Sequence, residues 1–241
     1  MRGRALSGGI IAAGEGRRLR ADGWLVPKPL VPVAGVPLLE AVIRNFLAAD
    51  IRPVTIIVNE YGRACVEWSR TRFPDVDLRF IVKTTASSLE SFAEVAAADT
   101  PGPMLMSTVD AWCRPPDFVR FVAAATARPP AATVLAVTPL VADEHPLWVT
   151  LGEGGRVRRL GGRSGDVVTA GLYLIPEALR RLPRPRGHER LRDFLAWLVE
   201  RGESVYAETI ETVVDVDRSS DVALAESLGQ EPRERVREVR G

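Results

Sequence analysis

The stretch that decides the fold lies near the start of the chain, where residues 7–40 read SGGIIAAGEGRRLRADGWLVPKPLVPVAGVPLLE. It opens with an apolar run at residues 10–13, which predicts a buried strand entering a glycine-rich turn. The turn, Gly14-Glu15-Gly16, is followed at once by two arginines, and Lys28 comes later between two prolines. Glycines after a strand let backbone N–H groups approach a phosphate closely, and Arg and Lys supply matching charge. The order of these residues therefore indicates an anion site.

Two better-known glycine patterns fail on this stretch. A dinucleotide-binding fingerprint requires a third glycine three residues beyond Gly16, where the chain has Leu19. A Walker A loop can be placed on Gly9 and Gly14, but it then requires Lys-Ser or Lys-Thr where Glu15 and Gly16 stand. The anion site is therefore of another kind.

The stretch resembles the nucleotidyltransferase superfamily, which includes sugar-1-phosphate nucleotidyltransferases and MobA-like NTP transferases. The family pattern is an apolar strand, A-G-x-G-x-R-L, a variable loop, and then P-K-P-L-x-P-x-x-G-x-P-L-L-E. The chain matches this pattern with AGEGRRL at residues 13–19 and with PKPLVPVAGVPLLE at residues 27–40. The resemblance implies a single three-layer α/β domain that is Rossmann-like and, more narrowly, GT-A-like.

Composition sets the broad class of the protein. The chain has 241 residues, 46% of them hydrophobic, which suits one α/β domain with a sizeable core. A formal net charge of +1 gives no strong field for nucleic acid or an anionic membrane. We expect Cys65 and Cys113 to be core residues. No apolar run approaches the ~18 residues that a membrane-spanning helix needs. We therefore expect a cytoplasmic enzyme without nucleic-acid or membrane partners, and leave a homo-oligomer open.

Strands and helices are expected to alternate in the first half of the chain and to give way to successive strands in the second. The first half predicts strands at 53–58, 78–82 and 103–109, with helices at 37–49, 63–72, 87–98 and 116–127. From residue 131, strands follow at 132–138, 147–151, 156–160 and 167–174, then helices at 176–182 and 188–201, strands at 204–210 and 213–216, and a last helix from Ser219. This order predicts a mixed, mainly parallel central sheet with a β-rich second half.

One nucleotidyltransferase domain is expected over residues 1–229. Its nucleotide-binding half extends to about residue 130, and its acceptor-binding half covers residues 131–229. Residues 230–241 are rich in Arg and Glu, and we expect them to form a charged, solvated C-terminal tail.

Asp110 is the first candidate metal ligand. It closes the strand expected at 103–109, and ligands of open α/β sheets gather at the carboxyl ends of strands. The alternative is a turn or capping aspartate, because a proline-containing loop begins soon afterwards. The resemblance favours the first interpretation, since the family carries a metal-binding aspartate at the end of this strand.

The second candidate lies in TVVDVD at residues 212–217, which resembles the closing motif of the family. The resemblance places Asp215 at the second magnesium ligand, so that Asp110 and Asp215 would hold Mg²⁺ and leave positions for triphosphate oxygens. Asp217 points to the same side of the strand as Asp215, and either assists or only caps the next helix. A DxD pair is also found in glycosyltransferases, but here it lies near the C-terminus and not after the middle strand.

The resemblance implies attack by a phosphate monoester oxygen on the α-phosphorus of an NTP, with release of pyrophosphate. Such chemistry is mostly positioning and charge stabilisation. The resemblance assigns Arg18 to the β- and γ-phosphates, Lys28 to the charge between the α-phosphate and the incoming phosphate, and Ala13, Gly14 and Gly16 to the nucleotide. Only two of the 32 Lys and Arg residues are lysine, which indicates that Lys28 is kept for its compact ammonium charge.

Specificity is less well defined by the sequence. Residues 83–89, KTTASSL, occupy the segment that often reads the base in the family, so Lys83, Ser87 and Ser88 are expected at the nucleotide. The family's glutamine and Gly-Thr-Ala-type turn are absent here. The two serines are equally well explained as caps of the helix expected at 87–98.

The acceptor side carries TAGLY at residues 169–173, which is similar to the Gly-Leu/Ile-Tyr segment of the family and implies Gly171 near the acceptor. Family members that recognise hexoses often carry Glu and Lys shortly before it. Here the corresponding residues 160–163 are LGGR, so the glutamate is missing and Arg163 stands near the lysine position, where we expect it to bind the acceptor phosphate. The missing glutamate leaves room for a polyol, choline or other phosphate.

The sequence thus favours Mg²⁺-dependent transfer of a nucleotidyl group from an NTP to a phosphorylated small molecule, first of all a sugar 1-phosphate. A non-sugar acceptor such as phosphocholine, a polyol phosphate or a pterin cofactor is one alternative, and a non-catalytic nucleotide-binding regulatory paralogue is the other. An anionic nucleophile needs no general base, in agreement with only two histidines, His145 and His188, both expected to be structural.

Overall fold

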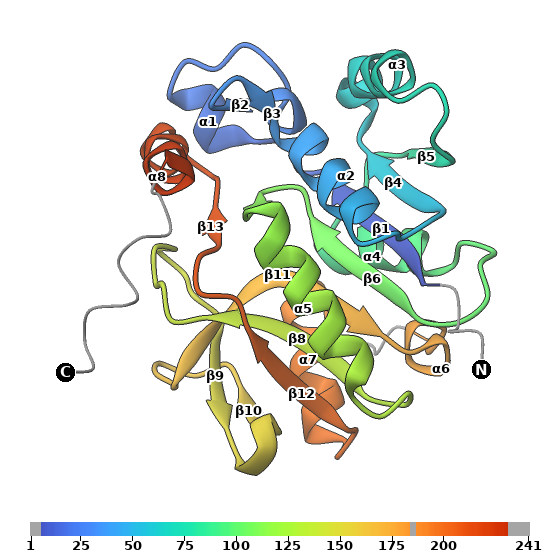
Figure 1. Ribbon diagram of the computed structural model, residues 1–241, viewed down its shortest axis with the longest axis vertical. Helices are drawn as coiled ribbons and strands as arrows, with labels where there is room; N and C mark the ends of the chain where they lie inside the picture. Colours follow the sequence, from blue (N-terminus) through green and yellow to red (C-terminus); the bar gives the residue numbers. More distant parts are fainter. Residues whose placement is uncertain (1–5, 184–186, 231–241) are drawn as a thin grey trace.

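The fold is built on a nine-stranded sheet in the computed structural model, which describes residues 6–183 and 187–230 (Figure 1). Four parallel strands form one half of the sheet: β1 (Ser7–Ala12), β4 (Val54–Val58), β5 (Leu78–Val82) and β6 (Met104–Thr108). Their spatial order is β5-β4-β1-β6. Continuous apolar runs such as VTIIV in β4 suit strands that are covered on both faces. The expected α/β fold with a mainly parallel central sheet is confirmed.

A long antiparallel strand, β11 (Val167–Ile175), joins the two halves of the sheet. It pairs with β6 on one side and with β8 (Thr133–Thr138) on the other, and β12 (Val205–Thr209) runs parallel to β8. The hairpin of β9 (Trp148–Leu151) and β10 (Val157–Leu160) pairs with the start of β11. These strands make the second half β-rich, as the sequence predicts.

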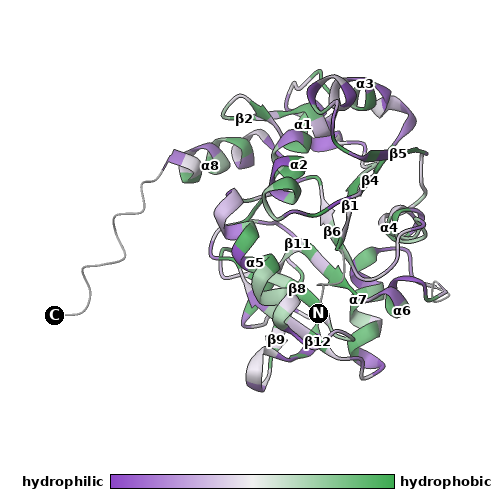
Figure 2. Ribbon diagram, turned by 45° about the vertical axis from the view of Figure 1, so that its right-hand side comes forward, coloured by the Kyte–Doolittle hydropathy of each residue, from purple (hydrophilic) through white to green (hydrophobic). Residues whose placement is uncertain are grey.

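Helices cover both faces of the sheet and complete three layers. The helices α2 (Leu38–Ala48), α3 (Arg63–Arg72) and α5 (Pro115–Ala127) contribute to one hydrophobic cluster. The helices α4 (Ser88–Ala96) and α7 (Leu191–Glu200) contribute to a second cluster on the opposite face. Figure 2 shows hydrophobic residues along the central strands and hydrophilic residues on the outward sides of the helices. Burial of apolar surface on both faces therefore holds the sheet between two helical layers.

Each hydrophobic cluster contains a pair of tilted phenylalanines that joins two helices. Phe46 of α2 and Phe118 of α5 have ring centroids 5.3 Å apart. Phe92 of α4 and Phe194 of α7 are also separated by 5.3 Å. Such aromatic pairs contribute about 0.5–1.5 kcal/mol beyond the burial of their area.

Two glycines in the central strand β1 let helices approach it closely from both faces. A Cβ atom at Gly8 would lie 2.5 Å from the ring of Phe46 in α2. A Cβ atom at Gly9 would lie 2.6 Å from the side chain of Val95 in α4. These glycines therefore serve packing of the core, whereas the glycines of the turn that follows β1 serve the site.

Short elements make the connections, and the sequence does not predict all of them. The helix expected at 63–72 and the strand expected at 78–82 have these bounds in the structure, whereas those expected at 176–182 and 213–216 are shorter. The short elements and the last helix are α1 (Arg17–Ala21), η1 (Lys28–Leu30), β2 (Pro32–Val33), β3 (Val36–Pro37), η2 (Glu60–Gly62), β7 (Ala111–Trp112), η3 (Glu153–Gly155), α6 (Glu177–Arg180), β13 (Val214–Asp215) and α8 (Ser219–Gln230).

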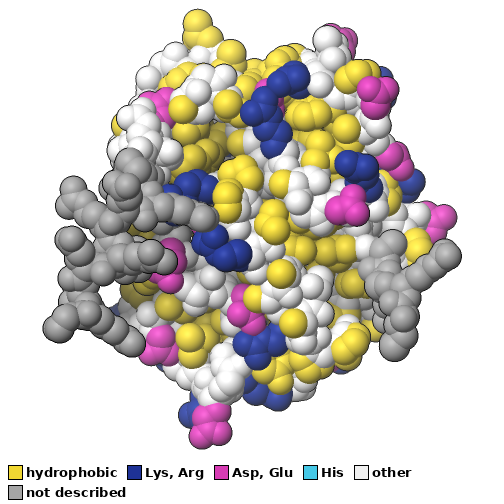
Figure 3. Space-filling model, in the orientation of Figure 1, with side chains coloured by type: hydrophobic (Ala, Val, Ile, Leu, Met, Phe, Trp, Pro, Cys, Tyr) yellow, Lys and Arg dark blue, Asp and Glu magenta, His cyan; other side chains and the backbone are white. Residues whose placement is uncertain are grey.

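Charge and cysteine placement agree with the composition. Figure 3 shows basic and acidic side chains interspersed over one face of the molecule. Cys65 and Cys113 are both buried free thiols, and burial raises their pKa values to about 11 and about 12. Within residues 6–183 and 187–230, no helix has both the length and the apolar character needed to cross a bilayer. Of the tail predicted at 230–241, Gln230 ends α8 and residues 231–241 lie outside the described residues.

Candidate active site

The site forms where two segments distant in sequence pair beyond the carboxyl end of β6. Asp110 lies in the turn between β6 and β7. The short strands β7 and β13 pair antiparallel, with Ala111 opposite Asp215. The backbone N–H of Val216 then donates to the carbonyl oxygen of Asp110 at 3.0 Å. This ladder brings the C-terminal Asp-containing segment to the end of the central sheet.

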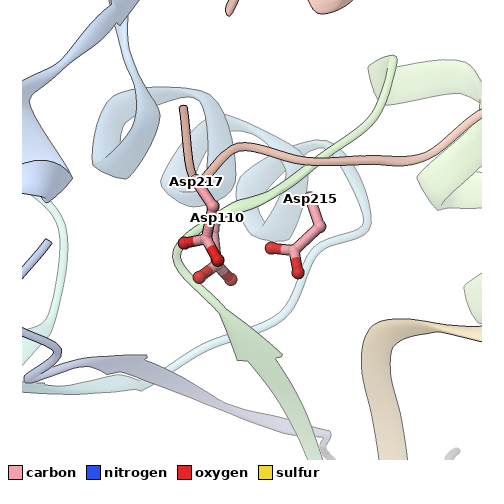
Figure 4. A group of neighbouring side chains, drawn as sticks. All are labelled: Asp110, Asp215 and Asp217. Atoms are coloured by element: carbon pink, nitrogen blue, oxygen red, sulfur yellow. The ribbon is translucent and has the colours of Figure 1, made fainter. Parts of the chain in front are cut away.

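Three carboxylates meet at this point (Figure 4). Asp110, Asp215 and Asp217 each offer one oxygen, and these oxygens all lie within 4.8 Å of one another. The structure thus brings together the two aspartates that were predicted as metal ligands. It also places Asp217, whose role the sequence leaves open, beside them.

Lys28 lies between two of these carboxylates. Its Nζ donates to Asp110 at 2.6 Å and also donates to Asp217, and the residue is only 8% exposed. The one-turn helix η1, which begins at Lys28 and has Pro29 in its first turn, sets the position of Lys28. Gly16, with φ of 61°, passes so close that a Cβ there would lie 2.7 Å from the Cβ of Lys28. The glycine-rich turn and the lysine therefore form one packed unit.

Charges, more than burial, determine the protonation of these groups. Burial alone would lower the pKa of Lys28, but Asp110, Asp217 and Asp215 outweigh it and raise the pKa above its ordinary value. Burial would raise the pKa of Asp110, but the nearby Lys28 ammonium lowers it instead. The negative charge of Asp110, and after it burial, raises the pKa of Asp215 well above its usual range. Negative charge therefore exceeds positive charge around Asp215.

Arg18 extends the cationic side of the site toward solvent. Its Nη1 donates to Asp217 at 2.7 Å, so that Asp217 receives hydrogen bonds from both Arg18 and Lys28. A second carboxylate, that of Glu144, lies 3.9 Å from the same guanidinium. Arg18 belongs to the short helix α1, which Gly16 begins in a left-handed conformation.

Asn59 holds the glycine-rich turn in place, and the sequence reasoning did not identify it. Its side-chain amide donates to the carbonyl oxygens of Ala13 at 3.1 Å and Gly14 at 3.3 Å. Its side-chain oxygen accepts from the backbone N–H of Gly62 at 2.9 Å. Asn59 directly follows the buried strand β4, so the rule that sites gather at the carboxyl ends of parallel strands could have found it.

Two cavities meet at the carboxylates. The first, here called the glycine-loop cavity, has a volume of about 500 Å³, and its lining includes Gly14, Gly16, Arg18, Lys28, Ser87 and Asp217. The second, here called the β11 cavity, has a volume of about 200 Å³, and its lining includes Thr138, Asp143, Thr169, Gly171, Arg192 and Asp215. Both cavities are lined by Ile11, Ser88, Thr108 and Asp110. Asp110 therefore stands at their junction.

All the predicted nucleotide residues except Lys83 line the glycine-loop cavity. Ala13, Gly14 and Gly16 line the glycine-loop cavity together with Ser87 and Ser88. The serines also have structural roles, because the Ser87 hydroxyl caps α4 by accepting from the Glu90 N–H at 3.1 Å, and the Ser88 hydroxyl accepts from the Leu191 N–H at 3.0 Å.

Lys83 differs from the other predicted nucleotide residues in its surroundings. It is paired with Glu94 at 2.8 Å and with Glu90 at 3.0 Å, and it is not among the residues that line either cavity. Its predicted contact with the nucleotide stays a prediction.

The two predicted acceptor residues also lie in different places. Gly171 lines the β11 cavity, and a Cβ there would lie 2.6 Å from the hydroxyl oxygen of Thr108. Arg163 is exposed in the turn between β10 and β11, outside the lining of both cavities. The cation that lines the β11 cavity is Arg192, in the first turn of α7. Nothing in the sequence distinguishes Arg192 from the many other arginines of the chain.

The three carboxylates suit a hard divalent cation. All their donor atoms are oxygens, which Mg²⁺ prefers, and their spacing lets one ion contact oxygens from more than one residue. In the described part of the chain, the Asp215 carboxylate forms no hydrogen bond or ion pair of its own. The negative charge of Asp110 raises the pKa of Asp215 even though Lys28 opposes it, so a cation beside Asp215 would be stabilised. Asp110, Asp215 and Asp217 are therefore the residues that would hold Mg²⁺.

The chain belongs to the MobA-like NTP transferase family. Residues 8–202, which include the glycine-rich turn, Lys28, Asp110 and Gly171, match the family model described as a MobA-like NTP transferase domain. The predicted membership of the nucleotidyltransferase superfamily is thereby confirmed. Asp215 and Asp217 lie beyond the matched residues.

Two curated relatives resemble this chain over part of their length. One is a bifunctional IPC transferase and DIPP synthase of Rubrobacter xylanophilus, 30% identical over 235 residues, covering 91% of this chain and 51% of the relative. The other is a CMP-5'-(3-aminopropyl)phosphonate synthase of Streptomyces rubellomurinus, 26% identical over 178 residues, covering 71% of this chain and 28% of the relative. The chain thus spans about half the length of the first relative and less of the second.

Solved structures share the fold along nearly the whole chain. An inositol-1-phosphate CTP transferase from T. maritima has a TM-score of 0.80 at 17% identity, covering 95% of this chain and 97% of that chain. A UDP-glucose pyrophosphorylase complexed with UDP-glucose has a TM-score of 0.77 at 12% identity, covering 93% and 98%. Because the sequence identities are only 17% and 12%, these similarities support the fold alone.

Proposed function

We propose that this protein transfers the cytidylyl group of CTP to a small phosphorylated polyol and releases pyrophosphate, with Mg²⁺ as cofactor. The observation that carries the proposal is the position of Asp110 at the junction of two cavities, in contact with Lys28 and beside two further carboxylates. Two separate cavities suit a reaction that joins two substrates, and the charged groups between them suit the transfer of a phosphoryl-type group.

The larger cavity is the proposed nucleotide site. The Gly14–Gly16 turn borders it, and Arg18 and Lys28 supply cationic charge for phosphates. Because Arg18 is held by Asp217 and Glu144, a triphosphate would exchange these carboxylate contacts for phosphate contacts. Arg18 would then bind the leaving β- and γ-phosphates, while Lys28 would neutralise charge at the α-phosphate.

The chemical step needs no proton transfer. An oxygen of the acceptor phosphate forms a bond to the α-phosphorus of CTP, and the bond from that phosphorus to the bridging oxygen of the β-phosphate breaks. Pyrophosphate leaves with the electron pair of the broken bond. A divalent cation held by the carboxylates would supply charge neutralisation at the phosphate oxygens. Lys28 is suited to the same task because its ammonium stays charged and buried.

The choice of CTP and a polyol rests on the relatives. The names of the Streptomyces and T. maritima proteins contain CMP and CTP, and the acceptor named for the latter is inositol 1-phosphate. The missing glutamate before Arg163 weighs against a hexose 1-phosphate, the acceptor that the sequence alone places first. A phosphonate is a close alternative, because it presents a similar tetrahedral anion.

The proposal is tested by pyrophosphate release with Mg²⁺, each common NTP, and a panel of acceptors. The panel contains myo-inositol 1-phosphate, glycerol 3-phosphate, glucose 1-phosphate, phosphocholine and 3-aminopropylphosphonate. We expect CTP with a polyol phosphate to give the highest kcat/KM. Turnover with a hexose 1-phosphate and another NTP would contradict the base and acceptor, while CTP binding without any turnover would favour the regulatory paralogue.

A further inference from the structure

Arg192 is the one Lys or Arg side chain among the described residues that line the β11 cavity. It lies in the first turn of α7, and it also borders a surface hollow shared with Arg18 and Asp217. Its guanidinium donates a hydrogen bond to the carbonyl oxygen of His145 at 3.3 Å. Within residues 6–183 and 187–230, no carboxylate lies at ion-pair distance from it. Arg192 is therefore a cation that has no anionic partner in the described part of the chain.

Two other arginines near the site, Arg18 and Arg218, are already paired. Arg18 contacts Asp217 and Glu144, and Arg218 contacts Glu144 at 3.1 Å. Lys28 is enclosed by Asp110 and Asp217 and belongs to the lining of the glycine-loop cavity, not to that of the β11 cavity. An anion that enters the β11 cavity would therefore meet Arg192 as its available cation.

An anionic acceptor needs such a cation. On its way to the junction, a phosphate or phosphonate dianion would face the carboxylates of Asp215 and Asp143, which repel it. A guanidinium can donate two parallel hydrogen bonds to such an anion and offset this repulsion. We propose that Arg192 binds the phosphorus group of the acceptor in the β11 cavity. This inference rests on the proposed function.

The rest of the cavity indicates the class of acceptor. One carboxylate oxygen of Asp143 accepts from the backbone N–H of His145 at 2.9 Å, and the other has no partner within the described residues. Asp143 and Thr169 therefore offer hydrogen bonds to hydroxyl groups, while Leu140 and Leu147 give part of the wall an apolar character. A volume of about 200 Å³ suits a small acceptor. The acceptor is thus a compact polyol monophosphate that binds through its phosphate to Arg192.

The test compares Arg192→Gln and Arg192→Lys with the control variant Arg63→Gln. Arg63 is an exposed arginine at the start of α3, outside the lining of both cavities. Steady-state kinetics give the KM for myo-inositol 1-phosphate and for CTP separately, and circular dichroism checks folding. We expect Arg192→Gln to raise the acceptor KM about 10-fold to 100-fold with little change in the CTP KM, as for loss of a charge-assisted contact. Arg192→Lys should recover part of the loss, and Arg63→Gln should match the wild type.

Three outcomes would overturn the inference. An unchanged acceptor KM in a folded Arg192→Gln variant would remove the anion-binding role. An increase in the CTP KM alone would assign Arg192 to the triphosphate. An increase in the acceptor KM on Arg163→Gln, with Arg192→Gln unaffected, would return the role to the exposed arginine in the turn before β11.

Calorimetry with myo-inositol 1-phosphate separates this inference from the proposed function. If the wild type binds CTP but turns over no acceptor, the proposed transfer fails. Binding of myo-inositol 1-phosphate that is weakened by Arg192→Gln would still support the anion site. Equal binding by the variant, or no binding by the wild type, would contradict it.

Discussion

The ammonium nitrogen of Lys28 lies 2.6 Å from a carboxylate oxygen of Asp110, although 82 residues separate the two in sequence. The contact joins the loop after β1 to the loop after β6, and these strands are neighbours in the parallel sheet. It therefore forms because the carboxyl ends of adjacent parallel strands meet at one edge. The arrangement also explains how a lysine that is only 8% exposed keeps its charge.

Replacing Lys28 by arginine should lower kcat by about 100-fold or more, because removal of one preorganised charge contact costs this much in other enzymes. The guanidinium is larger than the ammonium, and Gly16 and the two carboxylates leave it no room. Single-turnover kinetics with CTP and myo-inositol 1-phosphate would measure the loss. A folded Lys28→Arg variant with the full rate would show that a compact charge is not needed.

Replacing Asp110 by asparagine should abolish Mg²⁺-dependent turnover while the fold persists. Asp110 stands at the junction of the two cavities and contacts Lys28, so the substitution weakens both the metal site and the lysine. For the wild type, we expect EDTA to stop turnover and added Mg²⁺ to restore it. The measurement is the rate against Mg²⁺ concentration for both proteins; overlapping curves would remove Asp110 from the metal site.

Asp215→Asn should stabilise the protein in the absence of metal. A carboxyl group whose pKa is raised on folding holds its proton more tightly in the folded state, so its contribution to stability is unfavourable once pH rises above the unfolded pKa. Removing the charge at neutral pH therefore raises Tm, by about 1–4 °C for a chain of this size. Calorimetry would measure Tm with and without Mg²⁺.

Mg²⁺ should also raise the Tm of the wild type more than that of Asp215→Asn, because a ligand stabilises the state that binds it. The matched control is Asp75→Asn. Asp75 is an exposed residue outside the lining of both cavities. A metal-free Tm that falls in Asp215→Asn would contradict the excess of negative charge at this position.

Gly8→Ala should destabilise the fold by about 1–3 kcal/mol, because its new methyl group overlaps the ring of Phe46. Gly229→Ala serves as control, since a Cβ there would meet Trp112 at 3.4 Å, an ordinary contact. The free energy of unfolding would be measured in urea. Equal stability of Gly8→Ala and the wild type would show that α2 moves aside without cost.

Neither cysteine thiol should react in the native state at pH 8. Burial raises the pKa of Cys65 to about 11 and that of Cys113 to about 12, so both remain protonated and inaccessible. Labelling with iodoacetamide before and after unfolding would test this expectation. Rapid modification of either thiol without unfolding would contradict its place in the core.

The order of elements could be predicted because apolar periodicity is local information. The helix α3 and the strand β5 have the predicted bounds, since each is a continuous patterned run between turn residues. The pairing of β7 with β13 could not be predicted in this way, because two-residue strands carry no periodicity. That pairing carries Asp217 to Lys28, and so the sequence left the role of Asp217 open.

The glycine-rich turn and Lys28 could be linked from their order in the chain, and Asp110 could be added through its place after a strand and the resemblance to the family. The acceptor side could not be assigned in this way, because the relevant contacts depend on how α7 packs against the sheet. Arg163 precedes β11 in sequence, whereas Arg192 reaches the β11 cavity only through tertiary packing. Sequence alone therefore favoured Arg163, which is close to β11 along the chain, over Arg192, which lines the β11 cavity in the folded protein.

The most direct test of the proposed function follows the phosphorus atoms of both substrates. Phosphorus NMR of the protein with Mg²⁺, CTP and myo-inositol 1-phosphate distinguishes pyrophosphate, inorganic phosphate and a new diphosphate diester. We predict that one diester and one pyrophosphate form for each CTP consumed, that neither forms with Asp110→Asn, and that with Lys28→Arg both form more slowly by about 100-fold or more. Release of inorganic phosphate from CTP, with the acceptor resonance unchanged, would contradict nucleotidyl transfer at this site.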